Sequence, residues 1–223
     1  MKAPVVVAID GPAGAGKSTI ARRVAARLGY LYVDTGAMYR AVALWAIRNR
    51  TDLEDWHRLE QLALAADIQL EERSGRVLLN GEDVTEAIRD ESISDAASRV
   101  SAAPGVRKAL VEKQKQFALK HSVVMEGRDI GTVVFPDARV KIFLDAASQI
   151  RADRRHRQLC DKGIENDPDQ TEREIRSRDN RDRTRAEAPL LQAPDAEYVD
   201  ATSMDIEAVE EAVLRIVRAR TSH

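Results

Sequence analysis

Apolar and polar positions at the start of the chain predict alternating strands and helices. Residues 5–9 form a short, wholly apolar, β-branched run, typical of a strand buried on both faces of a parallel sheet. A glycine-rich turn follows, and from Ser18 apolar residues recur at helical spacing until Gly29. Residues 30–33 then predict a second strand and residues 37–49 a second helix. This order favours an α/β fold with parallel strands.

The pattern changes between residues 51 and 103. A helical pattern at 56–66 is followed by two short apolar runs, 68–73 and 76–81, on either side of Ser74-Gly75. Two such runs around a turn predict a small antiparallel hairpin. We interpret this region as an insertion into the α/β core.

The remaining chain returns to alternating elements. We expect helices at 92–101, 106–120, 150–162 and 206–220, strands at 122–125, 140–144 and 197–200, and a loop at 163–170. Thr171 and Glu174 match a capping box, which predicts that another charged helix begins there.

Composition excludes several classes of protein. Lys and Arg number 35 against 37 Asp and Glu, so the net charge of −2 indicates no nucleic acid polymer or anionic membrane as partner. The longest apolar run, residues 41–47, is far shorter than the roughly 20 residues of a membrane helix, and no secretory signal is readable. One cysteine, Cys160, excludes an internal disulfide, and the four histidines show no ligand spacing. We expect a cytoplasmic protein.

Arginine is unevenly distributed. It makes up 27 of the 35 basic residues, and ten arginines lie between residues 151 and 185 beside nine acidic residues. Codon bias could explain the excess of arginine over lysine, and a pair of solvated helices with i, i+4 ion pairs could explain the charged stretch. The alternative is a mobile helical lid that brings forked phosphate-binding groups over a nucleotide.

One motif carries explicit chemistry, a phosphate loop with the pattern G-x-x-x-x-G-K-[ST] between the first predicted strand and helix. Its backbone N–H groups and the N-terminus of the helix are suited to a polyphosphate, Lys17 to the terminal phosphates and the Ser18 hydroxyl to Mg²⁺. We assign ATP binding to Gly11, Pro12, Ala13, Gly14, Ala15, Gly16, Lys17, Ser18 and Thr19. A GTPase switch would need an N-K-x-D segment, which the chain lacks, so a small-molecule kinase is favoured.

Four segments together resemble the bacterial cytidylate (CMP) kinase family over essentially the whole chain. They are the phosphate loop, D-T-G-A-M-Y-R at 34–40, E-G-R-D-I-G-T-V-V-F-P-D at 126–137 and R-D-N-R-D-R-T-R at 178–185. The resemblance implies an α/β phosphate-loop nucleoside monophosphate kinase fold with a central five-stranded parallel sheet and flanking helices. It implies a single unit with core 1–50, 104–149 and 186–223, an inserted monophosphate-binding subdomain at about 51–103, as in the long form of the family, and an arginine-rich lid at about 150–185.

The implied reaction transfers the γ-phosphoryl group of ATP to CMP or dCMP, with Mg²⁺ as cofactor. Because the acceptor is itself a phosphate, largely a dianion at pH 7, no general base is needed. The resemblance suggests as partners only these nucleotides, and we expect a monomer.

The resemblance also implies residue roles. It assigns the acceptor phosphate and phosphoryl transfer to Arg40, Arg128, Arg178 and Arg185, the ribose to Asp182, and the base to Ser98, Arg107 and Asp129. Asp34 and Thr35 are further acceptor candidates at the carboxyl edge of the sheet. Arg154, Arg155 and Arg157 are candidates on the ATP side. We rank Arg154 and Arg157 first, because residues three apart share a helix face.

Plainer interpretations stand beside these assignments. Thr35 could equally cap a helix, Asp182 could pair with Arg181 or Arg183, and Arg40 could lie on the surface. A kinase for UMP, AMP or a metabolite hydroxyl is an alternative, in which Asp34 or Asp129 would serve as base. A slowly hydrolysing nucleotide switch is another.

Overall fold

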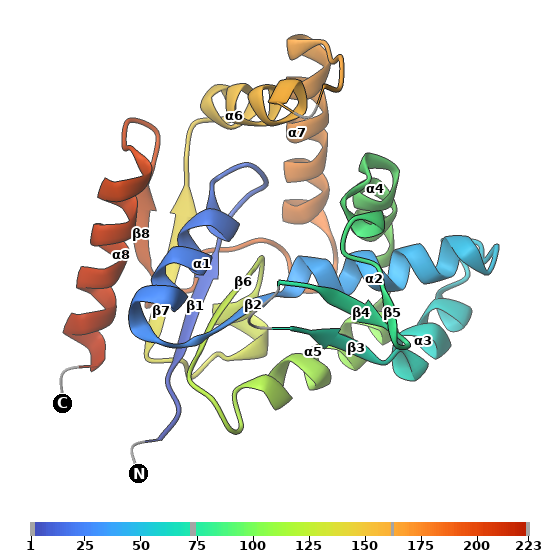
Figure 1. Ribbon diagram of the computed structural model, residues 1–223, viewed down its shortest axis with the longest axis horizontal. Helices are drawn as coiled ribbons and strands as arrows, with labels where there is room; N and C mark the ends of the chain where they lie inside the picture. Colours follow the sequence, from blue (N-terminus) through green and yellow to red (C-terminus); the bar gives the residue numbers. More distant parts are fainter. Residues whose placement is uncertain (1–2, 72–74, 162, 222–223) are drawn as a thin grey trace.

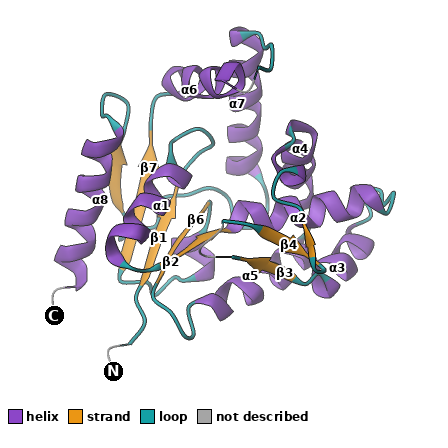
Figure 2. Ribbon diagram, in the orientation of Figure 1, coloured by secondary structure: helices purple, strands orange, loops and turns teal. Residues whose placement is uncertain are grey.

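The computed structural model describes residues 3–71, 75–161 and 163–221, and a five-stranded sheet forms the centre of the molecule (Figures 1 and 2). Its strands are β1 (Val6–Asp10), β2 (Leu31–Asp34), β6 (Val123–Gly127), β7 (Val140–Asp145) and β8 (Glu197–Asp200). They lie in the order β2-β6-β1-β7-β8, and each neighbouring pair is parallel. The predicted α/β fold with a parallel five-stranded sheet is confirmed.

Helices cover both faces of this sheet. Helices α1 (Lys17–Leu28) and α8 (Ile206–Thr221) share one apolar cluster with Val7 and Ile9 of β1. Helix α5 (Pro104–Phe117) and a π-helical turn at Ile130–Val134 share another with Ala8. Alternate residues of β1 thus point to opposite apolar layers, which explains why the whole strand is apolar in sequence.

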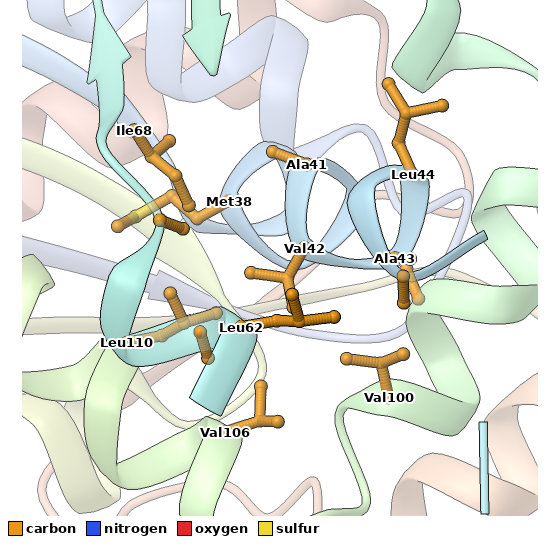
Figure 3. Close-up of a cluster of buried hydrophobic side chains, with 14 of the residues drawn as sticks. Met38, Ala41, Val42, Ala43, Leu44, Leu62, Ile68, Val100, Val106 and Leu110 are labelled. Carbon is orange, nitrogen blue, oxygen red and sulfur yellow. The ribbon is translucent and has the colours of Figure 1, made fainter. Parts of the chain in front are cut away.

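The inserted region packs around helix α2 (Thr35–Arg48). It contains α3 (Trp56–Ala65), β3 (Ile68–Leu70), β4 (Val77–Leu79), β5 (Glu82–Asp83), a 3₁₀ turn at Ala87–Arg89 and α4 (Glu91–Val100). The predicted hairpin pairs β3 with β4 antiparallel, and β5 adds a third strand. Ser74 of the predicted turn lies outside the described residues. Met38, Val42 and Leu110, all fully buried, join α2 and α5 to this layer (Figure 3).

Two charged helices form the upper part of the molecule. Helix α6 (Ser148–Asp161) lies across the top of Figure 1, and α7 (Pro168–Thr184) descends from it toward the sheet, close to α4. Lys162, the predicted end of the first of these helices, lies outside the described residues.

The capping box predicted at Thr171 is wrong. Helix α7 begins three residues earlier, at Pro168, because Asp167 accepts a hydrogen bond from the backbone N–H of Asp169 and serves as the N-cap. Proline suits the first helical position, since its missing N–H would have no helical partner there. Thr171 is instead a buried residue of the first turns, and its hydroxyl donates to the Asp167 carbonyl.

None of the helices in the described ranges has the length and apolar character that crossing a membrane requires.

Candidate active site

The phosphate loop joins the carboxyl end of β1 to α1. Gly11 has a φ of 151°, and a Cβ there would lie 1.9 Å from the Leu144 carbonyl oxygen, so only glycine fits between β1 and β7. Gly16 caps α1 in the left-handed conformation. The loop therefore leaves the sheet at its carboxyl edge, where ligands of α/β sheets bind, and the N-terminus of α1 lies at the same edge.

Lys17 lies at the centre of the site. It is 5 % exposed, and its ammonium donates to the Pro12 carbonyl at 2.7 Å. Burial lowers the Lys17 pKa to about 7, and the positive charges of Arg128 and Arg178 act in the same direction against Glu126. An anion bound here would offset both effects, so the surroundings of Lys17 favour a negatively charged ligand.

A groove of about 920 Å³ runs along one side of the phosphate loop. Gly14 to Thr19 line it together with all three ATP-side candidates, Arg154, Arg155 and Arg157. The guanidinium of Arg154 donates to the Ala201 carbonyl at 2.8 Å, while Arg155 pairs with Glu91 of α4. The structure thus brings all three arginines to this groove, and the ranking of Arg154 and Arg157 before Arg155 stays a prediction.

A second cavity, of about 220 Å³, lies on the other side of Lys17 and Ser18, which line both spaces. It is enclosed by the ends of β2 and β6, by α2, α4 and α5, and by α7. Every acceptor-side candidate lines it: Asp34, Thr35, Arg40, Ser98, Arg107, Arg128, Asp129, Arg178, Asp182 and Arg185. The structure thus brings together residues that are up to 151 positions apart, from Asp34 to Arg185.

Carboxylates accept hydrogen bonds from only some of the arginine side chains in this cavity. Arg128 donates to Asp182 at 2.8 Å and Arg40 to Asp34 at 2.9 Å. Buried donors without a hydrogen-bond partner remain on Arg40 (Nε), Ser98 (Oγ), Arg178 (Nε) and Arg185 (Nη2). Burial lowers the pKa of Arg178 to about 10, with the charge of Arg128 adding to the effect. Unmatched donors at this density are expected where a ligand supplies the acceptors.

Asp129 stands at the far end of the cavity, where it accepts a hydrogen bond from Arg107 and lies 3.9 Å from Arg185. The Arg107 guanidinium is also 5.8 Å from the ring centre of Tyr39, which lines the same cavity. A carboxylate, a hydroxyl and two guanidinium groups therefore surround one end of the space.

Three of the open alternatives are settled by geometry. Asp34, not Thr35, is the N-cap of α2, and the Thr35 hydroxyl donates to the Glu126 carbonyl at 2.7 Å. Asp182 pairs with Arg128, 54 residues away, rather than with Arg181 or Arg183. Arg40 has a side chain only 22 % exposed and faces the cavity.

Sequence reasoning missed Glu126. This carboxylate is 4 % exposed, accepts a hydrogen bond from the Tyr32 hydroxyl at 2.6 Å and interacts with the Ser18 side chain. Burial and the nearby Asp34 charge raise its pKa, while Lys17 opposes them. An acidic residue near the carboxyl end of the strand beside β1 was the available signal, because ligands of α/β sheets gather at that edge.

Arg151 was missed as well. Its buried guanidinium donates to the carbonyls of Ala13 (2.9 Å) and Ala146 (2.8 Å) and pairs with Asp179 of α7 at 2.7 Å. One side chain thus ties both charged helices to the phosphate loop. Nothing distinguishes it in the sequence from the nine other arginines of residues 151–185.

A parallel α/β sheet with a phosphate loop at its edge and an arginine-lined cavity beside it defines a phosphate-loop kinase. The solved structure of a gluconokinase from Sinorhizobium meliloti 1021 shares the fold, with a TM-score of 0.52 at 13 % identity over 100 % of this chain and 97 % of that one.

Sequence comparison then identifies the family. The profile described as Cytidylate kinase matches residues 7–219. Relatives named "Cytidylate kinase" include those of Solibacter usitatus (58 % identity, over 98 % of this chain and 94 % of that protein) and Pelotomaculum thermopropionicum (52 %, over 96 % of each). That of Pasteurella multocida is 46 % identical over 94 % of this chain and 93 % of that protein. The chain belongs to the cytidylate kinase family, and the prediction of a kinase is confirmed.

Proposed function

We propose that this enzyme transfers the γ-phosphoryl group of ATP to CMP or dCMP, forming ADP and CDP or dCDP. The observation that carries the proposal is the set of buried donors on Arg40, Ser98, Arg178 and Arg185 that line one cavity and have no hydrogen-bond partner among the described residues. Three of these donors belong to guanidinium groups suited to a phosphate, and the fourth is the Ser98 hydroxyl, which lines the cavity together with Asp129 and Arg107. ATP occupies the groove along the phosphate loop, with Arg154 and Arg157 above it.

The reaction needs positioning and charge compensation rather than proton abstraction. The acceptor phosphate of a nucleoside monophosphate has a second pKa of about 6, so it attacks as a dianion at pH 7. Lys17 lies where the two cavities meet and, with Arg128, Arg178 and Arg185, stabilises the charge of the transferring group. Asp182 accepts a hydrogen bond from Arg128, and in this proposal it also accepts one from a ribose hydroxyl.

Recognition of cytosine rests on Asp129, Arg107 and Ser98. Cytosine offers an amino donor at N4 and acceptors at N3 and O2, so a carboxylate opposite N4 and donors opposite N3 and O2 fit it. Uracil carries an acceptor in place of the amino group and would leave Asp129 without its hydrogen bond. A mismatch of this kind costs about 1–3 kcal/mol of discrimination.

The donor set also fits Mg²⁺. Ser18, which lines both spaces, offers a hydroxyl, and Glu126, which lines the smaller cavity, offers a carboxylate that interacts with the Ser18 side chain. Mg²⁺ prefers oxygen ligands and usually keeps several waters with one or two protein ligands. When bound, the ion would neutralise charge on the β- and γ-phosphates. No group of three or more His, Cys, Asp or Glu side chains suited to a metal occurs among the described residues.

We further propose that residues 51–103 act as the acceptor-binding subdomain and residues 150–185 as a lid. Ser98 of α4 and Arg178 of α7 face the same cavity from these two regions, so approach of either region would close it. Every residue invoked comes from one chain, and a monomer would carry the complete site.

A coupled assay of ADP release, run with CMP, dCMP, UMP, AMP and shikimate at fixed Mg²⁺–ATP, tests the proposal. We expect rapid turnover with CMP or dCMP and at least tenfold lower efficiency with UMP. Equal efficiency with CMP and UMP would contradict the assignment of the base site. ADP release without any acceptor would instead support a nucleotide switch.

A further inference from the structure

Asp10 is a buried carboxylate that phosphoryl transfer does not use. It is the last residue of β1 and only 5 % exposed. One carboxylate oxygen accepts the backbone N–H of Ile130 at 2.8 Å, and the other accepts that of Gly131 at 2.7 Å. Both oxygens are thus bound to the two residues that follow Asp129.

The segment held in this way changes direction sharply. Strand β6 ends at Gly127, Arg128 and Asp129 follow, and the π-helical turn begins at Ile130. Asp129 has a φ of −148° and a ψ of 24°, outside regular helix and strand. Its carbonyl accepts hydrogen bonds from the backbone N–H groups of Val133 (2.9 Å) and Val134 (3.2 Å). The two bonds to Asp10 fix the backbone immediately after Asp129.

The close fit at Gly131 shows how tightly this contact is packed. A Cβ at Gly131 would lie 3.4 Å from a carboxylate oxygen of Asp10 and 3.2 Å from the Lys141 side chain. Burial and the Asp129 charge raise the pKa of Asp10 to about 6, against the effect of the two N–H groups and Lys17. Keeping a carboxylate at this place therefore costs free energy, which a purely packing role would not require.

We propose that Asp10 is a positioning residue for acceptor selectivity: it holds the 129–131 backbone so that the Asp129 carboxylate meets the amino group of cytosine. Because Asp10 directly precedes Gly11, the strand that leads into the donor loop also aligns the group that reads the acceptor base. This inference rests on the proposed function, since it concerns the base site described there.

The test compares kcat/KM for CMP with kcat/KM for UMP. In Asp10→Asn, the amide oxygen can still accept one N–H, but the amide nitrogen faces the other, so the segment loosens. We expect the CMP/UMP ratio to fall about tenfold, which is the effect of losing roughly one hydrogen bond to the edge of the base. A merely structural residue would lower both efficiencies alike and leave the ratio unchanged.

Gly131→Ala is a second, milder variant of the same contact. Its Cβ would lie 3.2 Å from the Lys141 stem, which must shift by a few tenths of an ångström, and in van der Waals contact with Asp10. We expect the CMP/UMP ratio to fall about threefold, less than for the loss of a whole hydrogen bond to the base. Glu210→Gln is the matched control, because Glu210 is an equally buried carboxylate (3 % exposed) that binds Arg23 away from the cavity. It should retain the wild-type ratio even if its unfolding midpoint falls.

Failure of the proposed function and failure of the inference about Asp10 give different results. A wild-type enzyme without a CMP preference contradicts the proposed function itself. A wild-type preference that is retained in Asp10→Asn contradicts only the inference about Asp10. If Asp10→Asn does not fold, Gly131→Ala alone decides, and an unchanged ratio in that variant overturns the inference.

Discussion

The donor and acceptor sides of this active site are built in different ways. The donor side is one continuous loop, residues 11–19, whose backbone N–H groups and helix terminus are suited to bind phosphate. The acceptor side is a cavity of charged and polar side chains from β2, β6, α2, α4, α5 and α7. A backbone site depends on few side chains, here Lys17 and Ser18, whereas a side-chain site can lose affinity or selectivity one residue at a time.

The largest expected effect is at the residue shared by both sides. Lys17→Ala should lower kcat about 10²- to 10³-fold, the usual cost of removing one group that stabilises transition-state charge. The ADP-release assay with CMP measures it, and Lys115→Ala, which removes an exposed lysine on α5, is the control. A change of less than tenfold would mean that the loop does not position the reacting phosphates.

Arg151→Lys tests whether the two sides are mechanically joined. A single ammonium cannot replace the contacts to Ala13, Ala146 and Asp179, and Asp179 would lose a buried partner. We expect the free energy of unfolding, measured in urea, to fall by about 3 kcal/mol. The KM values for ATP and CMP should both rise, because Ala13 belongs to the donor loop and Asp179 adjoins Arg178. A change confined to one substrate would separate the two sides.

Asp129→Asn addresses the acceptor side alone. An amide can present a donor to uracil O4, so the CMP/UMP ratio of kcat/KM should fall at least tenfold while the KM for ATP stays within about twofold. Parallel kinetics with both acceptors measure the ratio. An unchanged ratio would place base recognition elsewhere in the cavity.

The pH dependence of the same ratio gives a smaller effect. The pKa of Asp10 is raised to about 6 by burial and by Asp129, with Lys17 opposing and the Lys141 stem packed nearby. The carboxylate is therefore present above pH 6 and protonates as the pH falls through that value, which weakens its hold on Ile130 and Gly131. Between pH 7 and 5.5 the wild-type CMP/UMP ratio should fall a few-fold. This is less than the effect of losing one hydrogen bond to the edge of the base.

In Asp10→Asn the ratio should be flat over this range. Protonation of the acceptor phosphate cancels, because CMP and UMP carry the same group. A wild-type ratio that does not change with pH would argue against the pKa assigned to Asp10.

The smallest effect concerns contact between the lid and the acceptor-binding region. Arg181 of α7 pairs with Asp95 of α4 at 2.8 Å, and both side chains are substantially exposed. Asp95→Asn should alter kcat/KM by no more than about twofold at 0.15 M salt, since exposed ion pairs contribute about 0–1 kcal/mol. Repeating the assay at low salt should enlarge the difference. A tenfold loss would show that this pair holds the site closed.

The sequence predicted secondary structure correctly where residues close together in the chain determine it. The β1 strand, the glycine loop and the amphipathic helices follow from apolar periodicity and from glycine conformations within a few residues. The start of α7 shows the limit even of local reasoning, because Asp167-Pro168 competes with Thr171 as a cap and prevails.

The sequence by itself determined the α/β order, the donor loop and, through four segments in a fixed order, the family. Only the tertiary structure decided that Asp182 meets Arg128, that Arg151 rather than its neighbours supports the loop, and that Asp10 binds the backbone of Ile130 and Gly131. Backbone hydrogen bonding and periodicity act over a few residues and leave a trace in sequence. A buried ion pair or a side-chain bond to a distant backbone depends on how strands and helices pack, and residues 54 or 120 positions apart carry no local sign of it.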